Sequence, residues 1–156
     1  MKNLIEKFYA GFSKLDAETM ADCYHSEIEF EDPAFGKLSG DKAKNMWRML
    51  CRSQKGKDFQ ITFSNISYNN GIGKAHWEAF YTFSKTGRKV HNIVDAEFEF
   101  ENGKIIKHTD NFDLHKWAKQ ALGMKGFLIG STSFFKRKLN RKTNKMLLLF
   151  EQNLKK

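Results

Sequence analysis

Four strand-like segments joined by short turns, all placed after helical segments, are the feature that most constrains this fold. The segments are FQITFSNISY (59–68), KAHWEAFYTFS (74–84), KVHNIVDAEFEF (89–100) and KIIKHTDNF (104–112). Gly71, Gly87 and Gly103 lie in the turns between them, as is typical of hairpins. Hairpin-linked strands are antiparallel and cannot form parallel βαβ units. We therefore predict an α+β protein in which N-terminal helices pack on a curved antiparallel sheet.

The helical segments come mainly before these strands. Apolar residues at helical spacing predict a first helix over 3–15, and Asp16 is suited to cap a short second helix. Gly40-Asp41 opens a third helix that runs to about Arg52, and a fourth is expected over 114–122. The length of 156 residues favours one domain, which we place at 1–123, followed by a helical extension at 124–156.

The net charge of +9 belongs to this extension. Nine Lys and Arg residues lie in 124–156 against one acid, Glu151, whereas 1–123 hold 18 basic and 17 acidic residues. The segment SFFKRKLNRKTNKMLLLFEQNLKK also carries many apolar side chains and predicts a cationic amphipathic helix. Three roles remain open for it: docking on the protein body or a second subunit, which the broad apolar run 146–150 favours, contact with an anionic membrane surface, or contact with nucleic acid.

One carboxylate, Asp32, is expected on an apolar face. In EIEFED, strict alternation places Asp32 with Ile28 and Phe30, opposite three glutamates. Burial of an unpaired carboxylate costs several kcal/mol unless it finds donors or binds a proton. Asp32 is therefore either a group with a raised pKa, suited to proton transfer, or a cap for the turn that Pro33 begins.

The last strand offers a second such acid, Asp110, which shares a face with Ile106, His108 and Phe112. Other polar residues are predicted to face the opposite way. His76 and Glu78 alternate with apolar residues of their strand, and without a β-bulge Asp95 faces away from Val94 and Ala96. The simpler interpretation of that side is a solvated or dimer-facing surface.

Residues 3–122 resemble the nuclear transport factor 2-like superfamily, which includes ketosteroid isomerases, SnoaL-like polyketide cyclases and limonene epoxide hydrolases. The motifs that carry the resemblance are FEDPAFG (30–36) and FEFENGKIIKHTDNFD (98–113). It implies a cone-like fold, and Asp32 matches the general base of the isomerases. Asp110 resembles a catalytic Asp of the hydrolases.

The same resemblance gives weaker matches and one departure. Asp95 aligns with the second acid of the isomerases if the match is made on VD, whereas a match on the following FEF shifts it by one residue. His76 and Glu78 are the nearest match to an Arg and an Asp of the hydrolases. Phe8 stands where the isomerases have an oxyanion-donating Tyr. Tyr9 is adjacent but about 100° around the helix, which argues against its replacing that Tyr.

Six aromatic residues are candidates to line a pocket in this architecture, although a plain core role is the simpler interpretation for most. They are Phe8, Phe12, Tyr24, Trp47, Phe63 and Trp77. We expect no cofactor and no metal, because the sequence holds neither a phosphate-binding loop nor ligand spacing typical of a metal site. Proton transfer and acid-base addition of water need neither.

These patterns lead to two functional hypotheses. The first is a cofactor-free enzyme that isomerises, cyclises or hydrates a hydrophobic substrate, with Asp32 or Asp110 as the proton-transferring group. The second is a non-catalytic module of the same fold that binds a small ligand or a protein. The resemblance implies a homodimer through the outer sheet face. Charges within the first apolar run and the lack of a long apolar window lead us to expect a soluble, cytoplasmic protein.

Overall fold

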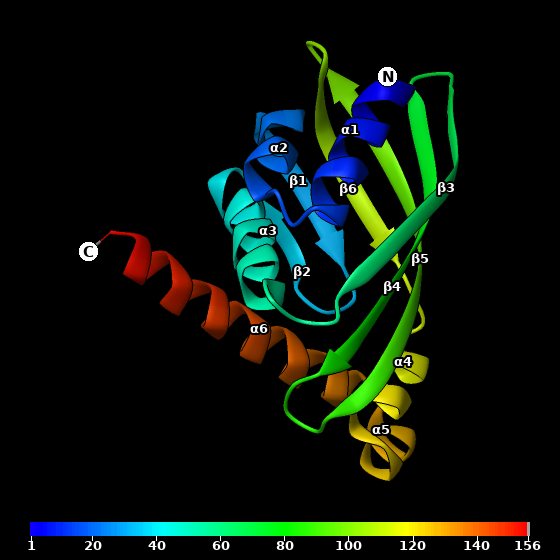
Figure 1. The fold of residues 1–156 in the computed structure, drawn as a ribbon, viewed down its shortest axis with the longest axis vertical. Helices are drawn as coiled ribbons and strands as arrows, with labels where there is room; N and C mark the ends of the chain where they lie inside the picture. The colour runs from blue at the N-terminus through cyan, green and yellow to red at the C-terminus, as the bar shows by residue number, and fades with distance from the viewer. Residues whose placement is uncertain (156) are drawn as a thin grey trace.

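The computed structural model describes residues 1–155 and shows helices packed on one curved six-stranded sheet (Figure 1). The strands are β1 (Tyr24–Asp32), β2 (Gly36–Ser39), β3 (Gln60–Asn69), β4 (Ile72–Phe83), β5 (Arg88–Glu101) and β6 (Lys104–Asn111). The helices are α1 (Lys2–Ser13), α2 (Ala17–Cys23), α3 (Asp41–Gln54), α4 (Leu114–Leu122), α5 (Met124–Ile129) and α6 (Ser133–Leu154). The α+β class and the helix-covered curved sheet are confirmed.

The strand order is β2-β1-β6-β5-β4-β3, and the prediction of an antiparallel sheet needs one correction. Strands β3 to β6 form an antiparallel meander, but β1 pairs with β6 in parallel. The chain makes a long excursion through α3 and the meander before it returns beside β1, which permits that orientation. The short strand β2, which was not predicted, pairs with the end of β1.

Three register shifts interrupt the strand pairing of the sheet, one of them between Tyr24 and Glu29 in the β1–β6 pair. The β3–β4 register shifts between Ser64 and Ser67, where Asn65 has a φ of 54°, and the β5–β6 register shifts between Glu99 and Phe100. Such bulges increase local twist and bend a strand. Helices α1, α2 and α3 lie over the same face of this sheet (Figure 1).

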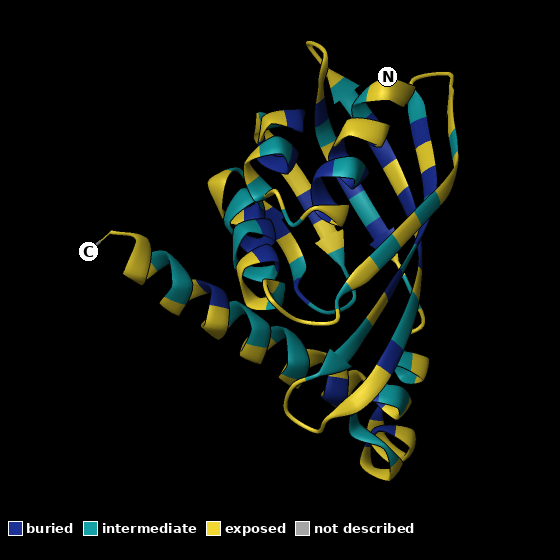
Figure 2. Ribbon diagram, viewed as in Figure 1, coloured by how far each residue is buried: buried dark blue, intermediate teal, exposed yellow. Residues whose placement is uncertain are grey.

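The hydrophobic core fills the space between these helices and the sheet, where the buried residues gather (Figure 2). Alternation along the strands assigns the faces, since Ala75, Trp77 and Ala79 of β4 are buried while the residues between them are partly exposed. At Gly73 a Cβ atom would lie 2.8 Å from Ile5 Cδ1, so α1 and β4 approach closely there. The buried face is therefore the helix-covered one.

Helix α6 docks on the body at one end of the sheet, next to α3 (Figure 1). Its residue Asn140 donates hydrogen bonds to the backbone oxygens of Pro33 and Ala34, at 2.9 and 2.7 Å. Asn144 donates to the oxygen of Phe35 at 2.8 Å, and Leu147 is fully buried in the core. Of the three roles predicted for the extension, docking on the body is the one that the structure shows.

This docking predicts unequal effects for two adjacent leucines of α6. Leu147 is 0% exposed and Leu148 is 52% exposed. We expect Leu147→Ala to lower the free energy of unfolding by about 2–4 kcal/mol, because it leaves a cavity. Leu148→Ala should change it by less than about 0.5 kcal/mol. Urea denaturation of both variants makes the comparison, and equal effects would contradict the docked position of α6.

Candidate functional site

Asp32 closes β1 and caps the turn that follows, which we call the Asp32 turn (residues 32–36). Its Oδ1 accepts hydrogen bonds from the backbone N–H groups of Ala34 and Phe35, at 2.9 and 2.6 Å. Among residues 1–155, no hydrogen bond to its second oxygen, Oδ2, is found. The pKa of Asp32 is raised to about 7, chiefly because burial disfavours the charged form; the two N–H donors oppose this shift and the charge of Asp110 adds to it. Asp32 therefore fits both roles predicted for it, because it caps a turn and its pKa is also raised.

Asp110 lies at the end of a buried hydrogen-bonded chain that crosses the core. Trp47 Nε1 donates to the Tyr24 hydroxyl at 2.8 Å, and this hydroxyl lies 2.7 Å from His108 Nδ1. His108 Nε2 lies 2.9 Å from Asp110 Oδ1, which also accepts from Trp77 Nε1 at 3.2 Å. A neutral His108 with its proton on Nε2 satisfies every link, because Tyr24 then donates to Nδ1. The five side chains form the core chain, in which each proton is directed toward Asp110.

The core chain was only partly predictable. Alternation placed His108 and Asp110 on one face, and Tyr24 and Trp47 were identified only as aromatic candidates. Tyr24 directly follows α2, has an extended backbone and begins β1. Its pairing with His108, 84 positions further along the chain, depends on the β1–β6 contact. No local sequence signal reports that contact.

Tyr9 is a further polar group on which the charge of Asp110 acts. Its side chain is fully buried, and its hydroxyl has no hydrogen-bond partner among residues 1–155. Burial raises its pKa well above the usual value, and the charge of Asp110 raises it further. The ring lies between those of Phe63 and Trp77, with centroid distances of 5.6 and 6.1 Å. Tyr9 thus enters the core beside Phe8; that it does not replace the oxyanion-donating Tyr of the isomerases stays a prediction.

The six aromatic candidates lie mainly in the core. Phe8 stacks on Tyr24 at 5.2 Å, and Phe12 contacts Trp47 and Trp77 at 5.1 and 5.5 Å between ring centroids. These five are buried, whereas Phe63 is partly exposed. Contacts of this kind fill space between α1, α3 and the sheet.

Phe63 instead lines an open surface groove of about 700 Å³ between α1 and β3. The groove is lined by Asn3, Glu6, Lys7, Ala10, Phe63, Ser64, Asn65 and Ile66. Its floor at Phe63 is one aromatic layer away from Tyr9, which stacks on that ring. The groove thus lies next to a ring that packs on Tyr9.

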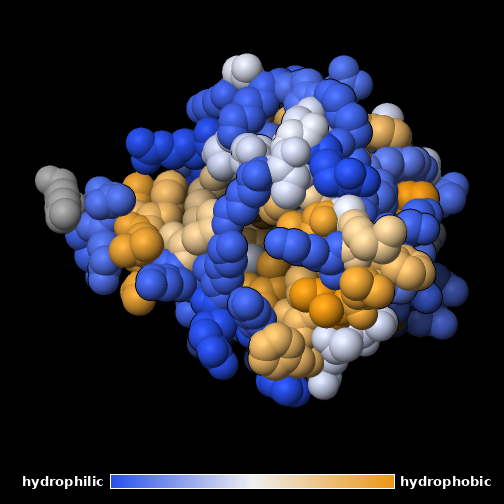
Figure 3. All heavy atoms as spheres, turned by 90° about the horizontal axis from the view of Figure 1, so that it is seen from below, coloured by the Kyte–Doolittle hydropathy of each residue, from blue (hydrophilic) through white to orange (hydrophobic). Residues whose placement is uncertain are grey.

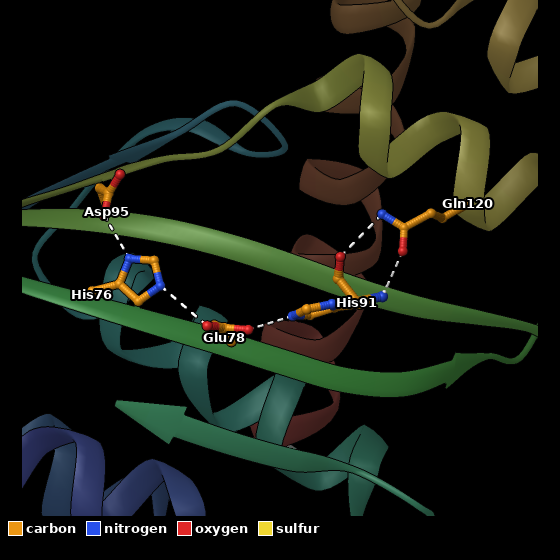
Figure 4. Close-up of polar contacts among 5 residues, drawn as sticks. All are labelled: His76, Glu78, His91, Asp95 and Gln120. Carbon is orange, nitrogen blue, oxygen red and sulfur yellow. Dashed lines mark hydrogen bonds and ion pairs between the residues drawn. The ribbon is translucent and has the colours of Figure 1, made fainter. Parts of the chain in front are cut away.

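The remaining site candidates lie on the outer face of the sheet, opposite α1, α2 and α3 (Figure 4). His76 Nδ1 lies 2.8 Å from Asp95 Oδ1, and His76 Nε2 lies 3.3 Å from Glu78 Oε1. Glu78 also contacts His91. Hydrogen bonds to Asp95 and then Glu78 raise the pKa of His76, while those from His91 and then His76 lower the pKa of Glu78.

This outer cluster is not part of the arrangement around Asp32 and Asp110. His76 and Glu78 alternate with buried residues of β4, and the side chain of Asp95 is 80% exposed. The register shift in β5 lies beyond Asp95, so it does not turn that residue inward. Within residues 1–155, no group of three or more His, Cys, Asp or Glu side chains is arranged to hold a metal ion.

Comparison with known proteins agrees with this fold. The family model described as SnoaL-like domain matches residues 5–108. A search of curated proteins found no match. TerC, co-crystallized with polyporic acid, is 16% identical with a TM-score of 0.65, over 77% of this chain and 96% of that one. An LEH-like epoxide hydrolase of M. tuberculosis is 19% identical with a TM-score of 0.57, over 83% and 95% of the two chains.

A third similar structure is an NTF2-like protein of unknown function from Cytophaga hutchinsonii, 18% identical with a TM-score of 0.58, over 72% of this chain and 98% of that one. At these identities the structures show the fold alone. The family model covers most of the chain, so the protein belongs to the SnoaL-like family, as the sequence motifs predicted. Its fold is similar to that of the NTF2-like protein.

The core chain predicts a large cost for the loss of one hydroxyl. Tyr24→Phe keeps the ring but leaves Trp47 Nε1 and His108 Nδ1 without their buried partner. We expect the free energy of unfolding to fall by about 1–3 kcal/mol. The matched control is Tyr68→Phe, because Tyr68 is exposed and its hydroxyl makes no hydrogen bond to a described residue. A loss no larger than that of the control in chemical denaturation would contradict the role of the core chain.

Proposed function

We propose that this protein binds a small hydrophobic molecule and carries out cofactor-free acid-base chemistry on it, of the isomerisation, cyclisation or hydration type. One observation carries the proposal: Asp32 and Asp110 belong to the same helix-covered side, and the charge of Asp110 raises the pKa of Asp32. A pair of carboxylates in such an environment is typical of acid-base sites. SnoaL-like family membership supports a small-molecule ligand, as do neighbours that include an epoxide hydrolase and a polyporic acid complex.

Within this pair, Asp32 is better suited to transfer the proton. A pKa of about 7 makes the acid and base forms comparable in abundance near neutral pH, where general acid-base catalysis is most efficient. Its Oδ2 is also free of hydrogen bonds from the described residues. Asp110 is fixed by His108 and Trp77, which suits it to position water or substrate.

Phe8 stands where the isomerases have a Tyr that donates a hydrogen bond to the oxyanion. In this protein the hydroxyl of Tyr9 supplies such a donor. Its high pKa keeps the hydroxyl protonated, and its proton has no acceptor among the described residues. A substrate oxygen near Asp110 would receive that hydrogen bond, which is worth most where charge develops on the oxygen. The groove at Phe63 offers the approach.

A non-catalytic module remains the second candidate, and the dense aromatic interior favours it. The rings of Phe8, Phe12, Trp47 and Trp77 occupy space that a bound ligand would need. Such a module would bind its ligand or protein partner at the open groove between α1 and β3 rather than between Asp32 and Asp110. In either case we propose a homodimer through the outer sheet face, where Phe80 and Ile93 are exposed.

Substitution of the acids separates the two candidates. A thermal-shift screen of steroid, polyketide and terpene-epoxide analogues identifies a ligand, and turnover of that ligand is then measured. We expect Asp32→Asn to lower kcat by about 10²–10⁴-fold and to change Kd by only a few-fold, because Asn keeps the turn cap but cannot transfer a proton. Asp110→Asn should also lower kcat.

The control for this experiment is Asp22→Asn, since Asp22 is exposed and lies outside the site. It should retain full turnover. Unchanged kcat in Asp32→Asn would contradict the assignment of Asp32. Ligand binding without turnover by the unmodified protein would favour the non-catalytic module.

A further inference from the structure

Helices α5 and α6 present an outward surface that the proposed function does not use. We propose that this extension surface binds the face of an anionic lipid bilayer. It comprises the exposed apolar residues Met124, Phe127, Leu128, Ile129, Phe134, Leu148 and Leu149 and the exposed basic residues Arg137, Lys138, Arg141, Lys142 and Lys145. It is separate from the docked side of α6, which carries Asn140, Asn144 and Leu147.

Helix geometry gathers one part of this surface into a single stripe. Phe134, Lys138, Arg141, Lys145 and Leu148 follow one another at spacings of four, three, four and three residues, which places them on one face of α6. All five are exposed. The stripe therefore has a basic centre with an apolar side chain at each end.

The positive charge of the stripe is not neutralised within the protein. Glu151 is the only acid in 124–156, and it accepts a hydrogen bond from Asn45 on the docked side. No ion pair in residues 1–155 includes a basic residue from the extension. Lys142 also lies beside Lys85 and lowers its pKa, chiefly through that side-chain contact, as expected for adjacent cations without a counter-charge. The extension surface thus lacks an anionic partner.

Apolar side chains are exposed on the same part of the molecule. Met124 is 71%, Leu128 68% and Phe134 62% exposed. Figure 3 views the end at which α5 lies and shows hydrophobic patches there, with hydrophilic side chains between them. A contiguous exposed apolar patch, unlike a single exposed apolar side chain, marks a surface that contacts a partner or a membrane. No helix in residues 1–155 is long and apolar enough to cross a membrane.

A bilayer surface matches both properties at once. Apolar side chains enter the boundary between headgroups and acyl chains, while Lys and Arg contact anionic headgroups. Nucleic acid would satisfy the basic residues but would give Leu128 and Phe134 nothing to bury against. A second copy would bring two positive surfaces together, since a two-fold interface pairs the same patch with itself.

Vesicle co-sedimentation of the full chain tests this proposal. The probes are vesicles of phosphatidylcholine with phosphatidylserine, vesicles of phosphatidylcholine alone, and duplex DNA and RNA. We expect binding to the anionic vesicles to be at least about tenfold tighter than to the neutral ones, and to weaken as salt is raised. Equal or absent binding to the two vesicle types, or tighter binding to either nucleic acid, would overturn the proposal.

Two sets of variants separate the charge and apolar contributions. Lys138→Glu, Arg141→Glu and Lys145→Glu together should weaken binding by about a hundredfold, since each basic residue contributes roughly fivefold. The matched control replaces three exposed lysines of the body by glutamate, Lys2→Glu, Lys55→Glu and Lys57→Glu, and so changes the net charge by the same amount. It should retain most of the binding.

The apolar part is tested at constant charge. Leu128→Ser with Phe134→Ser should weaken binding to anionic vesicles by at least about tenfold, because two inserted side chains are lost. Circular dichroism shows whether each variant keeps its helices. Equal loss in the body control, or full binding by both extension variants, would overturn the proposal, as would sedimentation showing that these residues instead form a dimer.

Discussion

The core chain from Trp47 through Tyr24 and His108 to Asp110 and Trp77 is the interaction on which the rest of the structure depends. It joins α3, β1, β6 and β4, and so fixes the helix layer against the sheet. A buried polar network stabilises a unique arrangement only if every member is satisfied. Here one tautomer of His108 satisfies all links. The carboxylate of Asp110 is thereby held in the core, where its charge acts on Asp32 and Tyr9.

A second constraint holds Asp32 from the outside. The Asp32 turn directs two N–H groups at Oδ1, and its carbonyls are bound by Asn140, Thr143 and Asn144 of α6. The extension therefore supports the backbone that positions Asp32 while its opposite face carries the unpaired positive charge. Through α6, the proposed chemistry and the proposed membrane contact share one element. Each can be tested separately because different side chains of that helix serve the two roles.

Alternation in the sequence was enough to predict which face several residues occupy. It placed Asp32 and Asp110 with apolar neighbours and His76 and Asp95 on the other side, because period-2 patterns are local. The parallel β1–β6 pairing, the short β2 and the Tyr24–His108 bond depend on contacts between distant segments. Tyr9 shows the same limit, since neither its burial nor its missing partner could be read from helix spacing. The dense packing of the aromatic candidates is likewise a tertiary property.

The most direct test of this account is the pKa of the Asp32 carboxyl, measured by NMR titration of its side-chain carbon in the unmodified protein and in Asp110→Asn. The account predicts a value of about 7 in the unmodified protein and a lower one in the variant, because the variant lacks the charge that adds to the effect of burial. A value near 4 in both proteins, typical of an exposed Asp, would contradict it. Asp32 would then serve only to cap its turn.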